Sequence, residues 1–274
     1  MLESAARPPI VPYVNPVTRA LRAGKVCIGA CAISFPGAAA AQISARAGFN
    51  FYYFDMEHSS LGYDDVAAIT TAAKLAGIVP IAGPTSHADH LVARPLDNGA
   101  MGVIVPHVET AEETASIVRW ARYAPLGTRG LLNMGTLTTF EPASGATWVK
   151  SQNEEILVAV KVESARGIDN IEKIAAVPGL DAILIGPGDL SATLGVPGDT
   201  THKLVQDCID RMLRAASKHG VAGGPHVGSA ADAVMWAKKG ARFMSLSFDG
   251  WLLYAASRDS VDAARARLGD QMMA

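Results

Sequence analysis

The sequence predicts a (β/α)8 barrel, the TIM-barrel class of α/β fold, formed as a single domain. Three observations predict this fold. Short apolar runs typical of buried strands alternate with helical segments, the chain holds eight such runs, and its 274 residues suit a barrel of roughly 250 residues. Strands that are apolar throughout, each followed by a helix, indicate a parallel sheet that is buried on both faces.

The predicted elements follow one another in a regular order. Residues 1–14 are rich in proline, and we expect them to form an extended arm. Asn15 and Pro16 are typical of a helix start, with Asn as the N-cap, and this helix should run to about Gly24. Strands are predicted at 26–32, 50–55, 78–82, 102–106, 156–163, 181–186, 220–224 and 242–247. Helices are predicted at 37–47, 64–76, 110–121, 167–177, 201–219 and 229–239.

Local signals support these helix ends. Thr110 and Glu113 have the spacing of a capping box, in which two side chains satisfy backbone N–H groups at a helix start. Glycines stand where several helices should stop, because a left-handed residue commonly ends a helix. These glycines are Gly48, Gly77, Gly99, Gly220 and Gly240.

The segment 128–155 is the longest stretch without a clear barrel unit. We expect it to be a long loop after the fourth strand that contributes to the mouth of the active site. The alternative fold is an open, doubly wound sheet. It is disfavoured because no G-x-G-x-x-G follows the first strand and no P-loop is present.

Composition excludes several classes of function. A net charge of -2 without a basic cluster argues against a nucleic-acid partner. No apolar run approaches the roughly 20 residues that cross a bilayer, and the N-terminus lacks the pattern of a secretory signal. Three cysteines, Cys27, Cys31 and Cys208, form an odd and sparse set that fits a reducing compartment. We therefore expect a soluble, cytoplasmic protein without a membrane partner.

In a barrel, chemistry lies at the C-terminal ends of the strands, so polar residues there are the candidates. Glu163 and Asp189 follow the fifth and sixth strands, which should be neighbours about 4.8 Å apart. Two carboxylates this close would repel unless a cation lies between them, and hard oxygen ligands suit Mg²⁺ or Mn²⁺. The alternative is structural, with Glu163 capping a helix and Asp189 closing a turn.

His58 follows Asp55 and Glu57 at the end of the second strand. An imidazole held by a carboxylate can act as a general base near neutral pH, although a surface histidine in a polar loop would give the same pattern. His107 and His226 fall at strand ends and remain open candidates. Asp97, late in a helix before the fourth strand, is equally typical of a turn.

Two longer blocks make the sequence more specific. The segments FNFYYFDMEHSSLG (49–62) and VAVKVESARGIDNIEKIAAVPGLDAILIGPGDLSATLG (158–195) closely resemble the HpcH/HpaI aldolase family. These are metal-dependent, class II pyruvate aldolases of the phosphoenolpyruvate/pyruvate barrel superfamily. LDNGAMGVIVPHVETAEE (96–113) and RYAPLGTRG (122–130) also look like the family, and the resemblance runs from about residue 16 to 268.

The resemblance implies a role for several residues. It implies a divalent metal, Mg²⁺ or Mn²⁺ with Co²⁺ as a further candidate, on Glu163 and Asp189. His58 matches the catalytic histidine and Asp97 the acid that partners it, with Asp55 nearby. The backbone amides of Gly188 and Asp189 match the group that holds the substrate carboxylate. The substrates implied are a 2-oxo acid and an aldehyde, joined or separated through a metal-stabilised enolate.

The resemblance also implies a homo-oligomer, a trimer or hexamer, in which a C-terminal helix packs on a neighbouring subunit. The apolar tail at about 250–268 suits that role. No partner other than small substrates and copies of the chain is implied.

Two positions depart from the family pattern. Gly83 stands where the family usually carries an arginine that helps to hold the substrate carbonyl, and Lys161 stands where Gln or Met is usual. Lys161 and Glu163 should share one face of a strand. Lys161 could therefore supply the charge missing at Gly83, support Glu163 as an ion pair, or act as a Schiff-base amine.

These departures leave three hypotheses. The first is a pyruvate-type aldolase for a 4-hydroxy-2-oxo acid. The second is a related carbon–carbon lyase that releases formaldehyde or cleaves a hydroxyacyl thioester, and the apolar loop 131–140 would suit its bulkier, less charged partner. The third is a binding protein that kept the fold without catalysis.

Overall fold

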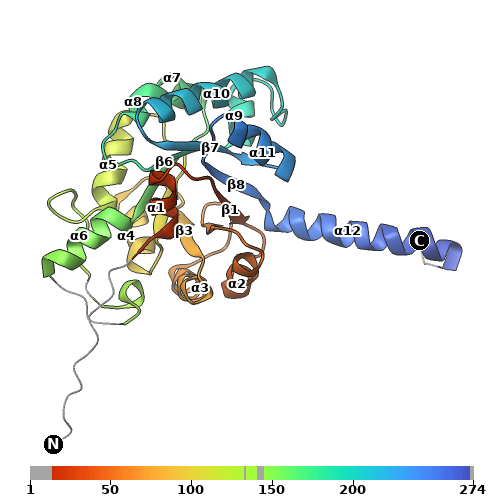
Figure 1. Ribbon diagram of the computed structural model, residues 1–274, viewed down its shortest axis with the longest axis horizontal. Helices are drawn as coiled ribbons and strands as arrows, with labels where there is room; N and C mark the ends of the chain where they lie inside the picture. The colour runs from red at the N-terminus through yellow and green to blue at the C-terminus, as the bar shows by residue number, and fades with distance from the viewer. Residues whose placement is uncertain (1–13, 133, 141–144, 272–274) are drawn as a thin grey trace, which may run out of the picture.

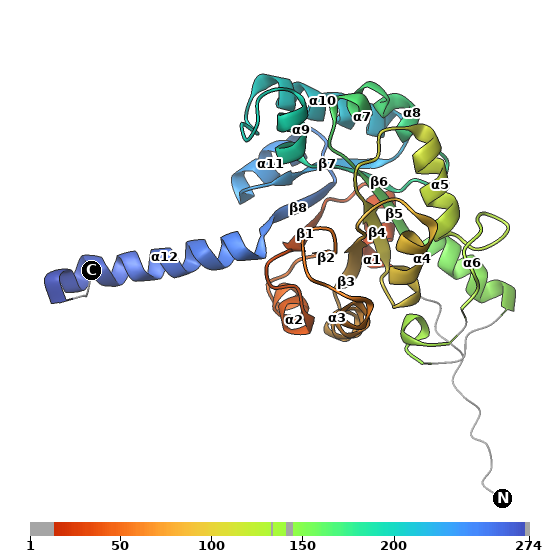
Figure 2. The same ribbon diagram turned by 180° about the vertical axis from the view of Figure 1, so that it is seen from behind.

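The computed structural model describes residues 14–132, 134–140 and 145–271, and it forms a closed barrel of eight parallel strands in sequence order. Helices surround the strands (Figures 1 and 2). The predicted (β/α)8 barrel is confirmed. The strands are β1 Cys27–Ala32, β2 Phe51–Asp55, β3 Val79–Gly83, β4 Gly102–Val105, β5 Leu157–Val162, β6 Ala182–Ile185, β7 Ala222–Val227 and β8 Phe243–Phe248.

The helices confirm most of the predicted segments. Asn15 caps the first helix by accepting hydrogen bonds from two backbone N–H groups, and Thr110 and Glu113 form the predicted capping box. The helices are α1 Pro16–Arg22, α2 Ala38–Arg46, α3 Tyr63–Ala76, α4 Asp89–Asp97, α5 Ala111–Ala121, η1 Thr136–Thr138, α6 Gly145–Glu155, α7 Ala165–Asp169, α8 Ile171–Ala175, α9 Pro187–Thr193, α10 Lys203–Lys218, α11 Ala230–Lys238, α12 Asp249–Leu268 and η2 Gly269–Gln271.

The seventh strand differs from its prediction. β7 runs from Ala222 to Val227, whereas the apolar pattern predicted 220–224. That prediction was wrong because Pro225 and His226 interrupt the apolar run although the backbone continues to pair with β6 and β8. His226 is therefore a strand residue, which fixes the direction of its side chain.

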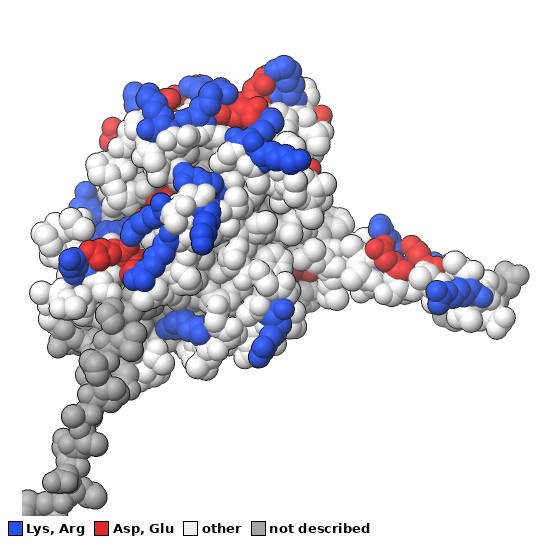
Figure 3. Space-filling view, viewed as in Figure 1, with Lys and Arg blue, Asp and Glu red and all other residues white. Residues whose placement is uncertain are grey.

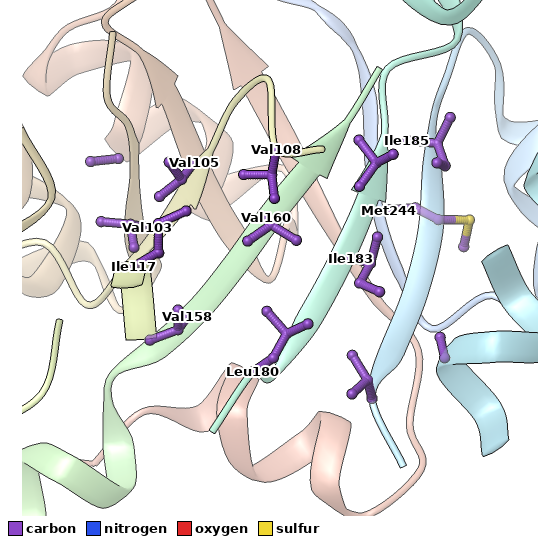
Figure 4. Close-up of a cluster of buried hydrophobic side chains, with 14 of the residues drawn as sticks. Val103, Val105, Val108, Ile117, Val158, Val160, Leu180, Ile183, Ile185 and Met244 are labelled. Carbon is purple, nitrogen blue, oxygen red and sulfur yellow. The ribbon is translucent and has the colours of Figure 1, made fainter. Parts of the chain in front are cut away.

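Side chains alternate between two hydrophobic layers along each strand. On β5, Val158 and Val160 point outward and pack with the outward residues of β4 and β6 and with helix residues such as Ile117 (Figure 4). Leu157 and Ala159 belong to the second cluster, which fills the barrel interior. There Phe51 and Phe243 stack with their ring centroids 4.8 Å apart. The same alternation brings Lys161, like Leu157 and Ala159, to the interior face.

Contrary to our expectation, the described residues of the segment 128–155 do not form part of the active-site mouth. β4 is followed by α5 within a few residues, so this segment comes after α5 and connects back to the start of β5. It contains α6, whose last residue Glu155 accepts a hydrogen bond from the Asn15 backbone and forms an ion pair with Arg19 at 2.6 Å. These contacts place α6 beside α1, at the N-terminal ends of the strands.

The last long helix leaves the barrel. α12 extends away from the strands as an arm in both views (Figures 1 and 2), and none of its described residues is buried. Its first half exposes large apolar side chains, with Trp251 63% exposed and Leu253 and Tyr254 each 55% exposed. Figure 3 shows a largely uncharged surface where the arm joins the barrel.

Two further expectations concern the ends of the chain and the membrane. The extended arm predicted for 1–14 lies outside the described residues except for Val14, which is not helical. Among the residues that the structure describes, no helix combines the length and the apolar character needed to cross a membrane.

Candidate active site

A cavity of about 610 Å³ opens at the C-terminal ends of the strands, where a barrel enzyme would hold its substrate. It collects most of the predicted site residues. Its polar lining is made by Tyr53, Asp55, His58, Lys161, Glu163, Asp189, Thr200, His226, Ser245 and Ser247. Its apolar lining includes Ile33, Leu184, Phe248, Trp251 and Leu252.

The end of β2 is organised by Asp55. One carboxylate oxygen accepts the backbone N–H groups of Glu57 and His58, each at 2.8 Å, and the other accepts the hydroxyl of Tyr53 at 3.0 Å. Asp55 is 2% exposed, and its oxygens are satisfied by these three donors. The buried carboxylate therefore fixes the turn that holds Glu57 and presents His58 to the cavity.

Glu57 lies between two imidazoles. Its Oε1 is 2.5 Å from Nε2 of His107, which follows β4, and its Oε2 is 3.5 Å from Nε2 of His58. Oε2 has no hydrogen-bond partner although it is buried. His107 has a left-handed backbone with φ 56°, which is unusual for a residue other than glycine and is often retained at functional sites.

Asp55, Glu57 and His58 each offer one ligand atom within 4.8 Å of the others, a separation that would suit a metal ion. However, the oxygens of Asp55 already accept the three hydrogen bonds that hold the turn. We therefore assign Asp55 to positioning His58.

Glu163 and Lys161 form the most buried ionic pair at the cavity. Nζ of Lys161 is 3.2 Å from Oε1 of Glu163 and 3.9 Å from Oε2 of Glu57, and Glu163 is only 4% exposed. Burial acts to lower the pKa of Lys161, but the carboxylates around it outweigh burial, so the pKa is raised and the amine stays protonated. Burial raises the pKa of Glu163, and Lys161 opposes that shift only in part.

Asp189 faces Glu163 from the next element. It lies in the first turn of α9, is exposed to the cavity, and its charge contributes to the raised pKa of Glu163. Gly186, the residue before α9, leaves room for the carboxylate, because a Cβ atom there would collide with Glu163. Two converging carboxylates, one of which raises the pKa of the other, are a donor set that fits a hard divalent cation.

The side of the cavity formed by β7, β8 and β1 is uncharged. Nδ1 of His226 is 2.7 Å from the hydroxyl of Ser245, and the His226 ring stacks on Phe248 with centroids 4.3 Å apart. Burial, with a smaller contribution from Lys161, lowers the pKa of His226 to about 4. Cys31 lies beside them, and burial raises the pKa of its thiol well above the usual value. Both groups are neutral near pH 7.

The space beside Gly83, where the family's arginine would extend, is filled by the side chain of Tyr53. A Cβ atom at this position would lie 2.5 Å from a ring carbon of Tyr53 and 2.7 Å from its hydroxyl. Tyr53 is 3% exposed and held by Asp55, so its ring cannot move aside freely. An arginine at position 83 would therefore require a smaller residue at position 53.

Asp97 is the predicted site residue that lies elsewhere. It ends α4 and so precedes β4, whereas His58 follows β2 at the opposite end of the barrel. Its Oδ1 accepts two hydrogen bonds from the Arg129 guanidinium, at 2.6 and 3.0 Å. Within a single chain, the expected pairing of Asp97 with His58 is not formed.

The apolar loop 131–140 is also absent from the described lining of the cavity. Its described part contacts α3 and α4. Within a single chain, the described residues of this loop therefore do not meet the expected bulkier, less charged partner, and Phe248, Trp251 and Leu252 supply an apolar wall instead.

Sequence reasoning missed two members of the cavity, Tyr53 and Ser245, and the contacts of Glu57 beside it. Glu57 was visible in the D-x-E-H motif, but only the structure shows that it contacts both His58 and His107. Tyr53 and Ser245 share the interior face with Asp55 and Phe243, so side-chain alternation could have identified them.

Comparison with known proteins agrees with the fold and identifies the family. A solved HpcH/HpaI aldolase from Desulfitobacterium hafniense superposes with a TM-score of 0.85 at 32% identity, over 90% of this chain and 95% of that one. The chain matches the HpcH/HpaI aldolase/citrate lyase family over residues 35–256, and it belongs to that family.

Two relatives with named activities cover nearly the whole chain. A hydroxypyruvate/pyruvate aldolase of Paraburkholderia phytofirmans is 34% identical over 93% of this chain and 99% of its own length. A 5-keto-4-deoxy-D-glucarate aldolase of Klebsiella pneumoniae is 32% identical over 92% of this chain and 97% of its own length. The resemblance inferred from the sequence motifs is confirmed.

Proposed function

We propose that this cavity makes or breaks the C3–C4 bond of a 4-hydroxy-2-oxo acid, with pyruvate and an aldehyde as the two products of cleavage. The observation that carries the proposal is the convergence of Glu163 and Asp189 beside Lys161 in one cavity at the catalytic end of the barrel. Membership of the HpcH/HpaI family supports the reaction class, a class II pyruvate aldolase-type lyase.

Glu163 and Asp189 would hold the divalent cation, Mg²⁺ or Mn²⁺ with Co²⁺ as a further candidate. When bound, the cation would supply Lewis-acid polarisation of the 2-oxo acid's oxygens. The backbone N–H groups of Gly188 and Asp189 lie in the first turn of α9, where a helix leaves amides without intrahelical acceptors. They would bind the substrate carboxylate.

His58 would act as the base. It is exposed to the cavity, its backbone is fixed by Asp55, and the carboxylate of Glu57 lies 3.5 Å from its Nε2. His58 takes the proton of the 4-hydroxyl group as the C3–C4 bond breaks, and the bonding electrons remain on pyruvate as its enolate. Glu57 stabilises the imidazolium that results. In the direction of synthesis, His58 returns this proton to the new hydroxyl group.

The aldehyde would occupy the uncharged side of the cavity. His226, Ser245 and Ser247 offer hydrogen bonds there, and Phe248 and Trp251 form an apolar wall. These residues favour an aldehyde without a second carboxylate. The relatives named as aldolases of hydroxypyruvate and pyruvate and of 5-keto-4-deoxy-D-glucarate support a 2-oxo acid as the other substrate.

Hydrogen exchange at the pyruvate methyl group tests the proposal. In D2O with Mn²⁺ or Mg²⁺, the protein should incorporate deuterium at C3 of pyruvate, and EDTA should stop the exchange. A panel of 4-hydroxy-2-oxo acids would then separate an aldolase from a formaldehyde-releasing or thioester-cleaving lyase. Metal binding without any exchange would contradict catalysis and favour a binding protein.

We also propose that the chain assembles as a trimer or hexamer through α12, since this helix exposes Trp251, Leu253 and Tyr254 and buries none of its described residues within one chain. The cytoplasm remains the proposed compartment, on the grounds of three free cysteines in an odd number.

A further inference from the structure

A buried ammonium group, that of Lys161, lies beside Glu163, one of the two proposed metal ligands. Among the described residues that line the cavity, Lys161 is the only lysine or arginine. Its ammonium nitrogen is 3.2 Å from Oε1 of Glu163, and the two residues are 8% and 4% exposed. Solvent and salt therefore screen this pair poorly.

This charge opposes the binding of a cation at Glu163 and Asp189. Glu163 and Asp189 together carry two negative charges, and Lys161 cancels one of them. A divalent cation that approaches the two carboxylates meets a net charge of about -1 instead of -2, and it is repelled by the ammonium group beside Glu163. Lys161 should weaken the binding of the metal alone.

The same charge favours an anion once the metal is present. Asp55 and Glu57 add further negative charge beside the ammonium group of Lys161. With the metal in place, Lys161 makes the site one unit more positive than it would be without the ammonium group, and that unit complements the carboxylate of a 2-oxo acid. Lys161 therefore penalises the metal-only state and favours the state in which metal and substrate are both bound.

We propose that Lys161 couples metal binding to substrate binding, so that the divalent cation binds weakly alone and tightly together with the 2-oxo carboxylate. This inference rests on the proposed function, since it requires the metal at Glu163 and Asp189. By thermodynamic linkage, the metal must strengthen substrate binding by the same factor by which substrate strengthens metal binding.

A purely structural lysine would have the opposite effect. If Lys161 served only to hold Glu163 in place, its removal would weaken metal binding. Glu163 has other constraints, however. The His107 backbone N–H donates to its Oε2 at 3.5 Å, and the space beside Gly186 accommodates its carboxylate. The position of Glu163 is thus set from two sides that do not involve Lys161.

The test measures the affinity of Mn²⁺ by calorimetry or by its electron paramagnetic resonance signal, with and without saturating pyruvate. Lys161→Met removes the charge with little change in size, Lys161→Gln is a second neutral variant, and Lys161→Arg keeps the charge as the matched control. Without pyruvate, both neutral variants should bind Mn²⁺ at least about tenfold more tightly than the wild type. The factor by which pyruvate strengthens Mn²⁺ binding should be smaller in these variants, by about the same tenfold. Lys161→Arg should retain the wild-type coupling.

Neutral variants that bind Mn²⁺ alone no more tightly than the wild type would overturn the inference. Unchanged enhancement by pyruvate in these variants would overturn it as well. Glu163→Gln and Asp189→Asn separate this failure from that of the proposed function. If they retain wild-type Mn²⁺ affinity, the metal site itself is wrong. If they lose Mn²⁺ while the Lys161 variants match the wild type, only the coupling role fails.

Discussion

The cavity has two halves that are built by the same barrel but differ in charge. The ends of β2 and β5 and the start of α9 bring together Asp55, Glu57, Lys161, Glu163 and Asp189. The ends of β7, β8 and β1 contribute no charged side chain to the described lining, and present neutral hydroxyl, thiol, imidazole and aromatic groups instead. The strand geometry is the same on both sides, so the side chains alone make the difference.

Burial has opposite consequences in the two halves. In the charged half, ion pairs at 3.2 and 3.9 Å keep the Lys161 amine protonated despite burial. In the other half, no carboxylate offsets the burial of His226, and burial together with the charge of Asp55 raises the pKa of the Cys31 thiol, so both groups remain neutral near pH 7. Charge development is therefore confined to one side, where the 2-oxo acid would react, and the other side can accept a less charged aldehyde.

Removing a carboxylate from the charged half should have the largest effect. Glu163→Gln or Asp189→Asn should abolish tight divalent-metal binding and turnover, because each removes one of the two hard anionic ligands. Mn²⁺ titration and an aldol-cleavage assay would measure both losses. Glu112→Gln, on the exposed surface of α5, is the matched control and should leave both unchanged.

Chelation provides an independent check of the same half. EDTA should inactivate the wild-type protein, and added Mg²⁺ or Mn²⁺ should restore it. Full activity after exhaustive chelation would show that the reaction does not require a metal at Glu163 and Asp189.

Removing the base should have a smaller effect than removing a ligand. His58→Ala should lower turnover by about 10²–10⁴-fold, the usual contribution of a positioned acid or base, with metal affinity nearly unchanged. Steady-state kinetics and Mn²⁺ titration separate the two properties. His90→Ala, an exposed histidine on α4, is the control. Loss of Mn²⁺ from the His58 variant would instead make His58 a metal ligand.

The charged half was largely predictable from sequence, and the neutral half was not. Glu163, Asp189 and His58 follow apolar runs, so the barrel rule placed them at one end, and side-chain alternation correctly predicted that Lys161 and Glu163 share a face. The neutral half depends on His226, which lies within a strand that the apolar pattern ended too early. Side-chain alternation places Ser245 on the interior face, but its contact with His226 cannot be read from the sequence.

The segment 128–155 was misplaced for a different reason. α6 has several buried polar residues, including Gln152, Asn153 and Glu155, so it lacks the apolar period that identifies a helix. Asn153 instead exchanges hydrogen bonds with the Tyr123 backbone, and Glu155 binds α1. Pairings between residues so distant in the sequence cannot be read from local patterns. However, the predicted helix at 110–121 already implied that this segment follows α5 and so lies at the N-terminal end of the barrel.

Acid should break the distinction between the halves by protonating His226. Its pKa is about 4 in the folded protein against an ordinary value of 6.5. Between these values the unfolded chain binds a proton that the folded protein does not, so the free energy of unfolding should fall as the pH drops below 6.5. Well above pH 6.5 this histidine should contribute almost no pH dependence. From pH 7 to pH 5 the loss due to His226 should be about 2 kcal/mol, at 1.36 kcal/mol per pKa unit.

Urea unfolding of the wild type and of His226→Asn at pH 7 and pH 5 would measure this contribution. Asparagine cannot be protonated but can still hydrogen-bond Ser245, so the variant should lose about 2 kcal/mol less than the wild type over this range. His90→Asn, at an exposed position, should lose as much as the wild type. Addition of Lys161→Met to the wild type should reduce the loss slightly, because Lys161 is the second cause of the lowered pKa. If His226→Asn is as acid-sensitive as the wild type, His226 is not held neutral by burial, and the uncharged half of the cavity can carry charge during the reaction.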